Sequence, residues 1–171
     1  MACPSSSVSR LYLSLGSNMG DKRANLVKAR KLLSGHPDIT VTDNSPIYRT
    51  APWGEKDQDW FLNACLAIRT ALSPEKVLEQ CQDIENRLGK IKIRHWGPRI
   101  IDIDLIAYDD GRKICNHHLT IPHPFALQRC FVLVPLADIA PGLILEGRTI
   151  REHLNRLDCH DLEHDTEKYE W

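Results

Sequence analysis

Two aspartates separated by one residue are the most informative feature of this sequence. Asp102 and Asp104 lie within residues 100–108, where most other residues are apolar. Side chains two positions apart on a strand point to the same face, so we expect the two carboxylates to lie side by side. Such a pair is costly to bury unless a cation or a proton neutralises it. Carboxylate oxygens combined with substrate phosphates are typical ligands of Mg²⁺, which predicts a magnesium site.

A basic segment leads directly into this pair. Lys90, Lys92, Arg94, His95 and Arg99 all fall within ten residues of one another. A metal-bound polyphosphate such as ATP needs cations to bridge its oxygens and basic side chains to neutralise the remaining charge. The alternative is a solvated basic loop beside a solvated strand face, with the aspartates paired to these basic residues.

Residues 16–22 (G-S-N-M-G-D-K) superficially resemble a phosphate-binding loop, but they lack the spacing G-x-x-x-x-G-K-[ST]. An ATP site in this chain is therefore expected outside the P-loop class. Within residues 120–131, His123, Arg129 and Phe131 are candidates for contacts with a phosphate or a base. The alternative there is a corner between a loop and a helix, with a solvated arginine and a phenylalanine in the core.

A further loop, residues 48–54, contains Trp53 and is followed by Phe61 and Asn63. An apolar wall with backbone polar groups and one amide suits a planar heterocycle. The alternative is a surface loop that packs its tryptophan on the core.

Composition limits the remaining possibilities. The chain has 171 residues, with 22 Lys and Arg against 23 Asp and Glu, which suits a single domain spanning residues 1–171. A net charge of −1 argues against a general binder of nucleic acids or anionic membranes. No apolar run approaches a membrane span, and the first ten residues lack the apolar core of a signal peptide. The six cysteines form no C-x-x-C pair, and we expect reduced thiols and a cytoplasmic protein.

A zinc site is the less favoured interpretation of one histidine-rich stretch. Cys115, His117, His118 and His123 match no standard zinc spacing.

The elements that position these residues follow the order β-α-β-β-α-β, which predicts an α+β fold with a ferredoxin-like core. The expected elements are a strand over residues 10–15, a helix over 21–34, strands over 39–48 and 61–69, a helix over 74–88 and a strand over 100–108. A C-terminal extension of short strands and helices follows: strands over residues 113–115 and 142–145, a helical stretch from about residue 125, and a last helix with the capping box Thr149–Glu152. Residues 1–9 and 159–171 are expected to fray.

Four segments together resemble the 6-hydroxymethyl-7,8-dihydropterin pyrophosphokinase family of folate biosynthesis. They are residues 11–18 (L-Y-L-S-L-G-S-N), 96–106 (W-G-P-R-I-I-D-I-D-L-I), 119–123 (L-T-I-P-H) and 135–141 (P-L-A-D-I-A-P). The resemblance covers nearly the whole chain and implies transfer of pyrophosphate from ATP to the pterin hydroxymethyl group, with release of AMP. It further implies two Mg²⁺ ions held by Asp102 and Asp104.

The resemblance also implies the roles of individual residues. Those implied in catalysis are Arg94, Arg99, Asp102 and Asp104. Those implied in pterin binding are Thr50, Ala51, Trp53, Phe61, Asn63, Trp96 and Phe131. Those implied in ATP binding are Gln82, Glu85, Lys90, Lys92, Arg94, Trp96, Arg99, Leu105, Thr120, His123 and Arg129. Ala51 departs from the family pattern, where proline is expected, and no side chain is an obvious general base.

Two other classes of protein remain open at this point. A palm-like nucleotidyltransferase also places carboxylates on a ferredoxin-like sheet, but it releases pyrophosphate. A non-catalytic regulatory module of the same fold would not need the aspartate pair. We expect a monomer, and the sequence leaves open whether the chain is one domain of a larger folate enzyme.

Overall fold

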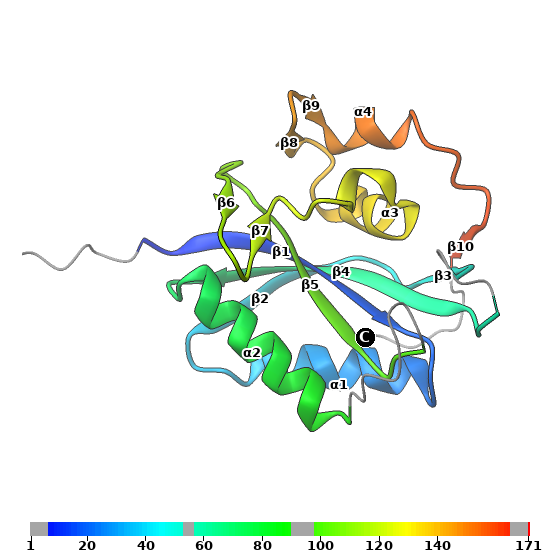
Figure 1. The fold of residues 1–171 in the computed structure, drawn as a ribbon, viewed down its shortest axis with the longest axis horizontal. Coiled ribbons are helices and arrows are strands. Elements are labelled where there is room, and N and C mark those ends of the chain that lie inside the picture. The colour runs from blue at the N-terminus through cyan, green and yellow to red at the C-terminus, as the bar shows by residue number, and fades with distance from the viewer. Residues whose placement is uncertain (1–6, 53–56, 90–97, 165–170) are drawn as a thin grey trace, which may run out of the picture.

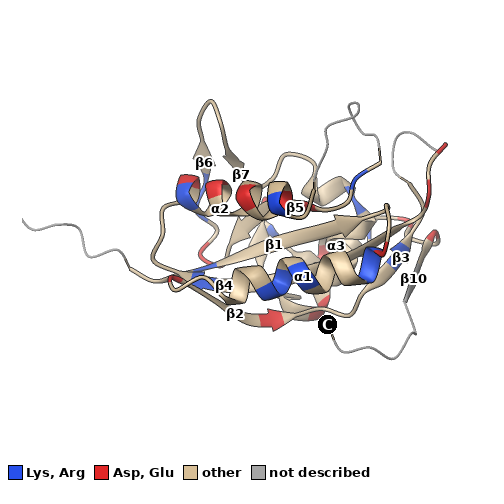
Figure 2. Ribbon diagram, turned by 90° about the horizontal axis from the view of Figure 1, so that it is seen from below, with Lys and Arg blue, Asp and Glu red and all other residues tan. Residues whose placement is uncertain are grey.

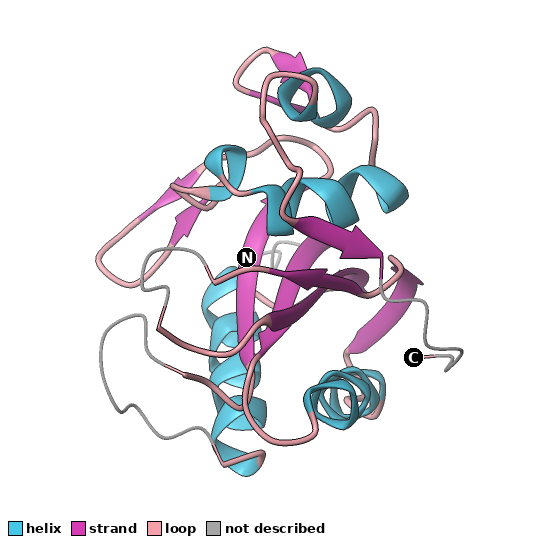
Figure 3. Ribbon diagram, turned by 90° about the vertical axis from the view of Figure 1, so that its right-hand side faces the viewer, coloured by secondary structure: helices cyan, strands magenta, loops and turns pink. Residues whose placement is uncertain are grey.

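The structure, a computed structural model, describes residues 7–52, 57–89, 98–164 and 171. In these residues antiparallel strands form one main sheet with helices on both faces (Figures 1 and 3). Its strands are β1 (Ser9–Ser17), β2 (Ile39–Asn44), β3 (Tyr48–Thr50), β4 (Phe61–Thr70), β5 (Asp102–Tyr108) and β10 (Leu162–His164). Two small hairpins pair β6 (Ile114–Cys115) with β7 (Thr120–Ile121), and β8 (Ile144–Leu145) with β9 (Arg148–Thr149). The α-helices are α1 (Lys22–Ser34), α2 (Pro74–Arg87), α3 (Cys130–Ile139) and α4 (Ile150–Leu154).

The strand order in the main sheet is β10-β3-β4-β1-β5, and β2 pairs with the other end of β4. Every neighbouring pair in this sheet is antiparallel. Strand β1 therefore lies between β4 and β5. Residues of β4 and β5 that are distant in the sequence thus lie on either side of the same β1 residue. Gly16 is the register partner of Asn63 on β4 and of Asp102 on β5.

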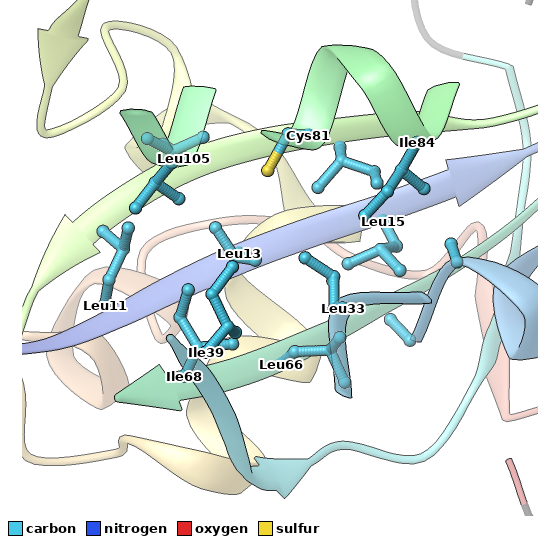
Figure 4. Packing of buried hydrophobic residues seen from close by; sticks show 14 of the residues in the cluster. Leu11, Leu13, Leu15, Leu33, Ile39, Leu66, Ile68, Cys81, Ile84 and Leu105 are labelled. Carbon is cyan, nitrogen blue, oxygen red and sulfur yellow. The ribbon is translucent and has the colours of Figure 1, made fainter. Parts of the chain in front are cut away.

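Two apolar layers hold the helices to the sheet. On one face, Leu11, Leu13 and Leu15 of β1 pack with Leu33 of α1 and Cys81 of α2 (Figure 4). Residues of α3 and α4, such as Leu133 and Ile150, pack with the alternate side chains on the other face. Full burial of each large aliphatic side chain contributes about 1.5–3 kcal/mol, so both layers are substantial. Charged residues occur along both α1 and α2 (Figure 2).

Local sequence signals set the helix starts as predicted. The Ser73 side chain accepts a hydrogen bond from the Lys76 N–H at 3.3 Å, with Pro74 at the first helical position. Thr149 and Glu152 form the predicted capping box, which is confirmed at the start of α4.

The expected strand over residues 39–48 is instead two strands. Proline has no N–H to donate to a sheet, and Pro46 lies at the break between β2 and β3. The Ser45 hydroxyl accepts a 2.9 Å hydrogen bond from the Cys65 N–H at this point. Strand β5 begins at Asp102 rather than at residue 100. The helical stretch expected from residue 125 is a 3-10 turn over Ala126–Gln128 followed by α3.

The prediction of a frayed C-terminal tail is wrong for the parts that the structure describes. Strand β10 pairs with β3, and Trp171 is buried with its indole Nε1 donating to the Ser45 carbonyl at 2.7 Å. The prediction of reduced thiols is wrong for Cys130 and Cys159, which form a disulfide. These contacts join segments far apart in the sequence, which a local pattern does not reveal.

Within the described ranges, none of the helices has the length and apolar character needed to span a membrane.

Candidate active site

A cavity of about 280 Å³ opens where the ends of β1, β4 and β5 meet the turn before α3. It brings together ten of the residues predicted for the site: Thr50, Ala51, Phe61, Asn63, Arg99, Asp102, Asp104, His123, Arg129 and Phe131. Residues from five separate parts of the chain thus line one space.

The register of the sheet accounts for this convergence. Asn63, Gly16 and Asp102 lie in one row across β4, β1 and β5. A Cβ atom on Gly16 would lie 2.6 Å from Asn63 Oδ1, closer than such atoms approach, so a larger residue would displace the amide. The absence of a side chain at Gly16 therefore leaves the Asn63 amide and the Asp102 carboxylate facing the same cavity.

One end of the cavity is apolar with a fixed amide. The buried Asn63 Nδ2 donates a 2.7 Å hydrogen bond to the Thr50 hydroxyl, which orients the amide. Phe61, Phe131 and Ala51 line the same cavity. Apolar walls around one oriented polar group are suited to a flat heterocycle with hydrogen-bonding edges.

The other end of the cavity carries both acidic and basic side chains. Asp102 and Asp104 both line the cavity, and the Arg99 guanidinium forms an ion pair with Asp102 Oδ2. The Asp102 side chain is 15% exposed and that of Arg99 is 32% exposed, so both remain accessible from the cavity. Arg99 therefore partly neutralises the pair, as the solvated-face interpretation required, but it does so inside a cavity and not on an open surface.

His123 and Arg129 complete this end. Burial lowers the pKa of His123, opposed by the charge of Asp104, while the charge of Arg129 lowers it further. Burial also lowers the pKa of Arg129, again opposed by Asp104. The Arg129 guanidinium lies 5.2 Å from the centre of the Phe125 ring and 5.5 Å from that of Phe131, which holds it between two aromatic walls.

The family model for 7,8-dihydro-6-hydroxymethylpterin-pyrophosphokinase matches residues 12–141. The chain belongs to this family. A 2-amino-4-hydroxy-6-hydroxymethyldihydropteridine pyrophosphokinase of Methylorubrum extorquens is 51% identical over 156 residues, covering 91% of this chain and 98% of the relative. The Bacillus subtilis protein of that name is 44% identical over 128 residues, covering 75% of this chain and 76% of the relative. The reaction is therefore pyrophosphoryl transfer from ATP to hydroxymethyldihydropterin, a step of folate biosynthesis.

The fold of this chain is similar to that of a solved structure. Wild-type HPPK-DHPS of Plasmodium falciparum with pterin and p-hydroxybenzoate aligns with a TM-score of 0.68 at 15% identity, covering 92% of this chain. This chain spans 46% of that longer protein.

Four further residues predicted to contact ATP are not among those that line the cavity. Glu85 on α2 is buried, and its Oε1 accepts a 2.7 Å hydrogen bond from the Ile103 N–H. The Leu105 side chain packs in the core beneath the sheet, on the opposite face of β5 from the aspartates. Gln82 and Thr120 are exposed. The ATP contacts of these four residues stay predictions.

Five predicted site residues lie outside the residues that the structure describes: Trp53, Lys90, Lys92, Arg94 and Trp96. Conversely, Ser14, Gln58 and Phe125 line the cavity although the sequence analysis did not single them out. Ser14 is opposite Asp104 in the β1–β5 register, so the alternation along residues 10–15 was a signal for it. In the described part of the chain, no group of three or more His, Cys, Asp or Glu side chains gathers as a metal site.

Proposed function

We propose that the pterin binds at the Asn63 end of the cavity and that the ATP phosphates bind at the end formed by Asp102, Asp104 and Arg99. The observation that supports this arrangement is the row Asn63–Gly16–Asp102 across three neighbouring strands. A substrate that contacts the amide at one end thereby reaches the carboxylates at the other. The pterin hydroxymethyl group then points toward the phosphates that it attacks.

Magnesium dependence is part of this proposal. Asp102 and Asp104 would hold two Mg²⁺ ions, because their hard oxygens line the cavity side by side and leave room for phosphate oxygens and water. When bound, such ions align the attacking and leaving oxygens of a phosphoryl group and absorb its developing charge.

Two arginines of the chain would also stabilise the negative charge of the phosphate groups. Arg99 and Arg129 line the cavity and can donate paired hydrogen bonds to phosphate oxygens. Phe125 and Phe131 hold Arg129 in place, so it loses little side-chain freedom on binding. Positioning and electrostatic stabilisation therefore account for most of the rate enhancement that we propose.

We further propose that the core is ferredoxin-like, and the strand order of the main sheet favours this description. If β2 and β3 are counted as one interrupted strand, the order across the main sheet is fourth, first, third, second, with β10 added at the edge. We further propose a monomer that works in the cytoplasm, where ATP is available, and that binds neither nucleic acid nor membrane. Sedimentation at a mass near 19.5 kDa tests the monomer.

Two variants test the proposed metal and phosphate end. We expect Asp102→Asn and Asp104→Asn each to lower kcat at least roughly a thousandfold and to weaken the Mg²⁺ dependence of nucleotide binding, because each removes a charged metal ligand. Asp110→Asn is the matched control, since Asp110 follows the same strand but is exposed and pairs with Arg112. Nearly unchanged turnover and unchanged Mg²⁺-dependent nucleotide binding in either active-site variant would overturn the proposal.

A further inference from the structure

The segment that superficially resembles a phosphate-binding loop contains a buried asparagine with an unusual set of partners. Asn18 follows β1 and is 2% exposed. Its Oδ1 accepts a 2.7 Å hydrogen bond from the Arg99 N–H, and its own N–H donates to the Arg99 carbonyl at 3.1 Å. Its Nδ2 donates to Gln58 Oε1 at 3.0 Å and to the Asp59 carbonyl at 3.2 Å.

One side chain thus joins two chain segments that enter the cavity from different directions. Gln58 and Arg99 both line the cavity, whereas Asn18 is not among the lining residues. Gln58 shortly precedes Phe61 and Asn63 at the pterin end, and Arg99 pairs with Asp102 at the phosphate end. A buried amide with its donors and acceptor engaged has a single orientation, so it fixes where each segment lies relative to the other.

We propose that Asn18 is a positioning residue that sets the distance between the pterin end and the phosphate end of the site. It does so through Gln58 and Arg99, without contact to either substrate. Displacement of reacting groups by about 1 Å can cost roughly a hundredfold in rate. The inference rests on the proposed role of Arg99 at the phosphate end.

Lys22 provides a matched control for this proposal. Its Nζ contacts Asp59 Oδ2 at 3.1 Å and donates to the Trp60 carbonyl at 2.8 Å. Lys22 therefore supports the same loop as Asn18 does, but the described contacts do not extend from it to Arg99. A variant of Lys22 loosens only the segment that contains Gln58, whereas a variant of Asn18 removes the connection between that segment and Arg99.

The test compares N18A, N18D and K22A by single-turnover rate, by the dissociation constants of pterin and MgATP measured separately, and by thermal unfolding. For N18A we expect the rate to fall roughly tenfold to a hundredfold, with each dissociation constant changed less than about threefold. N18D keeps the acceptor for the Arg99 N–H but sets a carboxylate against Gln58 Oε1, so its rate should lie between those of N18A and the parent. K22A should keep its rate within about threefold.

Two results would overturn the proposal: an N18A rate within twofold of the parent, or a loss in K22A as large as that in N18A. If N18A does not fold, the near-isosteric N18D is compared with K22A on the same terms. AMP formation by the parent protein is measured first. Its absence would contradict the proposed function, whereas its presence with unaffected Asn18 variants would contradict only the positioning role.

Discussion

Glu85 on α2 accepts a 2.7 Å hydrogen bond from the backbone N–H of Ile103, the residue between Asp102 and Asp104. The Ile103 side chain packs in the core, and the hydrogen bond from its N–H to Glu85 is itself buried. Helix α2 is therefore joined to β5 at the residue that lies between the two carboxylates lining the cavity.

Removal of this acceptor should destabilise the protein. We expect Glu85→Ala to lower the free energy of unfolding by about 2 kcal/mol, because a buried N–H loses its partner. Glu85→Gln keeps an acceptor at the same place and should cost about 1 kcal/mol or less. Urea denaturation measures both, and equal losses in the two variants would show that the hydrogen bond is not what matters.

A side chain at Gly16 should disturb the pterin end specifically. In Gly16→Ala the new methyl group would lie 2.6 Å from Asn63 Oδ1, so the amide must move and the pterin dissociation constant should rise at least about tenfold. Gly142→Ala is the control, because a Cβ there meets nothing within 4 Å. Calorimetry with the pterin measures both variants, and unchanged affinity in Gly16→Ala would contradict the assignment of this end.

Stability should depend on the titration of His123. Burial lowers the pKa of His123 in the folded protein below its ordinary value of about 6.5. Below about pH 6.5 the unfolded chain binds this proton first, so the free energy of unfolding falls as the pH is lowered toward the folded pKa. Well above pH 6.5 His123 is neutral in both the folded and the unfolded chain, so it does not make the free energy of unfolding depend on pH.

His123→Gln should therefore make the loss of stability between pH 7.5 and about 5.5 smaller. The exposed His117, changed to Gln, serves as the control. Thermal unfolding at both pH values measures the difference, and the idea fails if His123→Gln and the parent lose stability equally on acidification.

The disulfide should stabilise the C-terminal part of the chain. Cys130 and Cys159 are 29 residues apart, and a cross-link over such a loop contributes about 3.5 kcal/mol. We expect Cys159→Ser to lose about this much, while Cys115→Ser at an exposed free cysteine changes stability by less than about 0.5 kcal/mol. Chemical denaturation without reductant measures the stability of both variants. Equal stabilities of Cys159→Ser and Cys115→Ser would show that the cross-link contributes little.

Much of this fold follows from local signals in the sequence. The Ser73–Pro74 start of α2 and the Thr149–Glu152 capping box each need only residues within one helical turn. The alternation that set Asp102 and Asp104 on one face of a strand is equally local. These features were therefore predicted correctly without knowledge of the tertiary structure.

The features that were missed depend on contacts between distant segments. Asn18 lies 40 residues from Gln58 and 81 from Arg99, and a single asparagine after a strand carries no signal for either partner. The pairing of β10 with β3 and the Cys130–Cys159 disulfide are of the same kind. Spacing alone does not determine which distant segments meet, because that depends on the packing of the whole chain.

Product analysis by phosphorus nuclear magnetic resonance tests the central claim most directly. The protein is incubated with ATP, Mg²⁺ and 6-hydroxymethyl-7,8-dihydropterin, and with each substrate omitted in turn. We predict AMP and the pterin diphosphate in equal amounts, formed only when both substrates and Mg²⁺ are present. ADP, or free pyrophosphate as the stoichiometric product, would contradict pyrophosphoryl transfer and would favour a kinase or a nucleotidyltransferase instead.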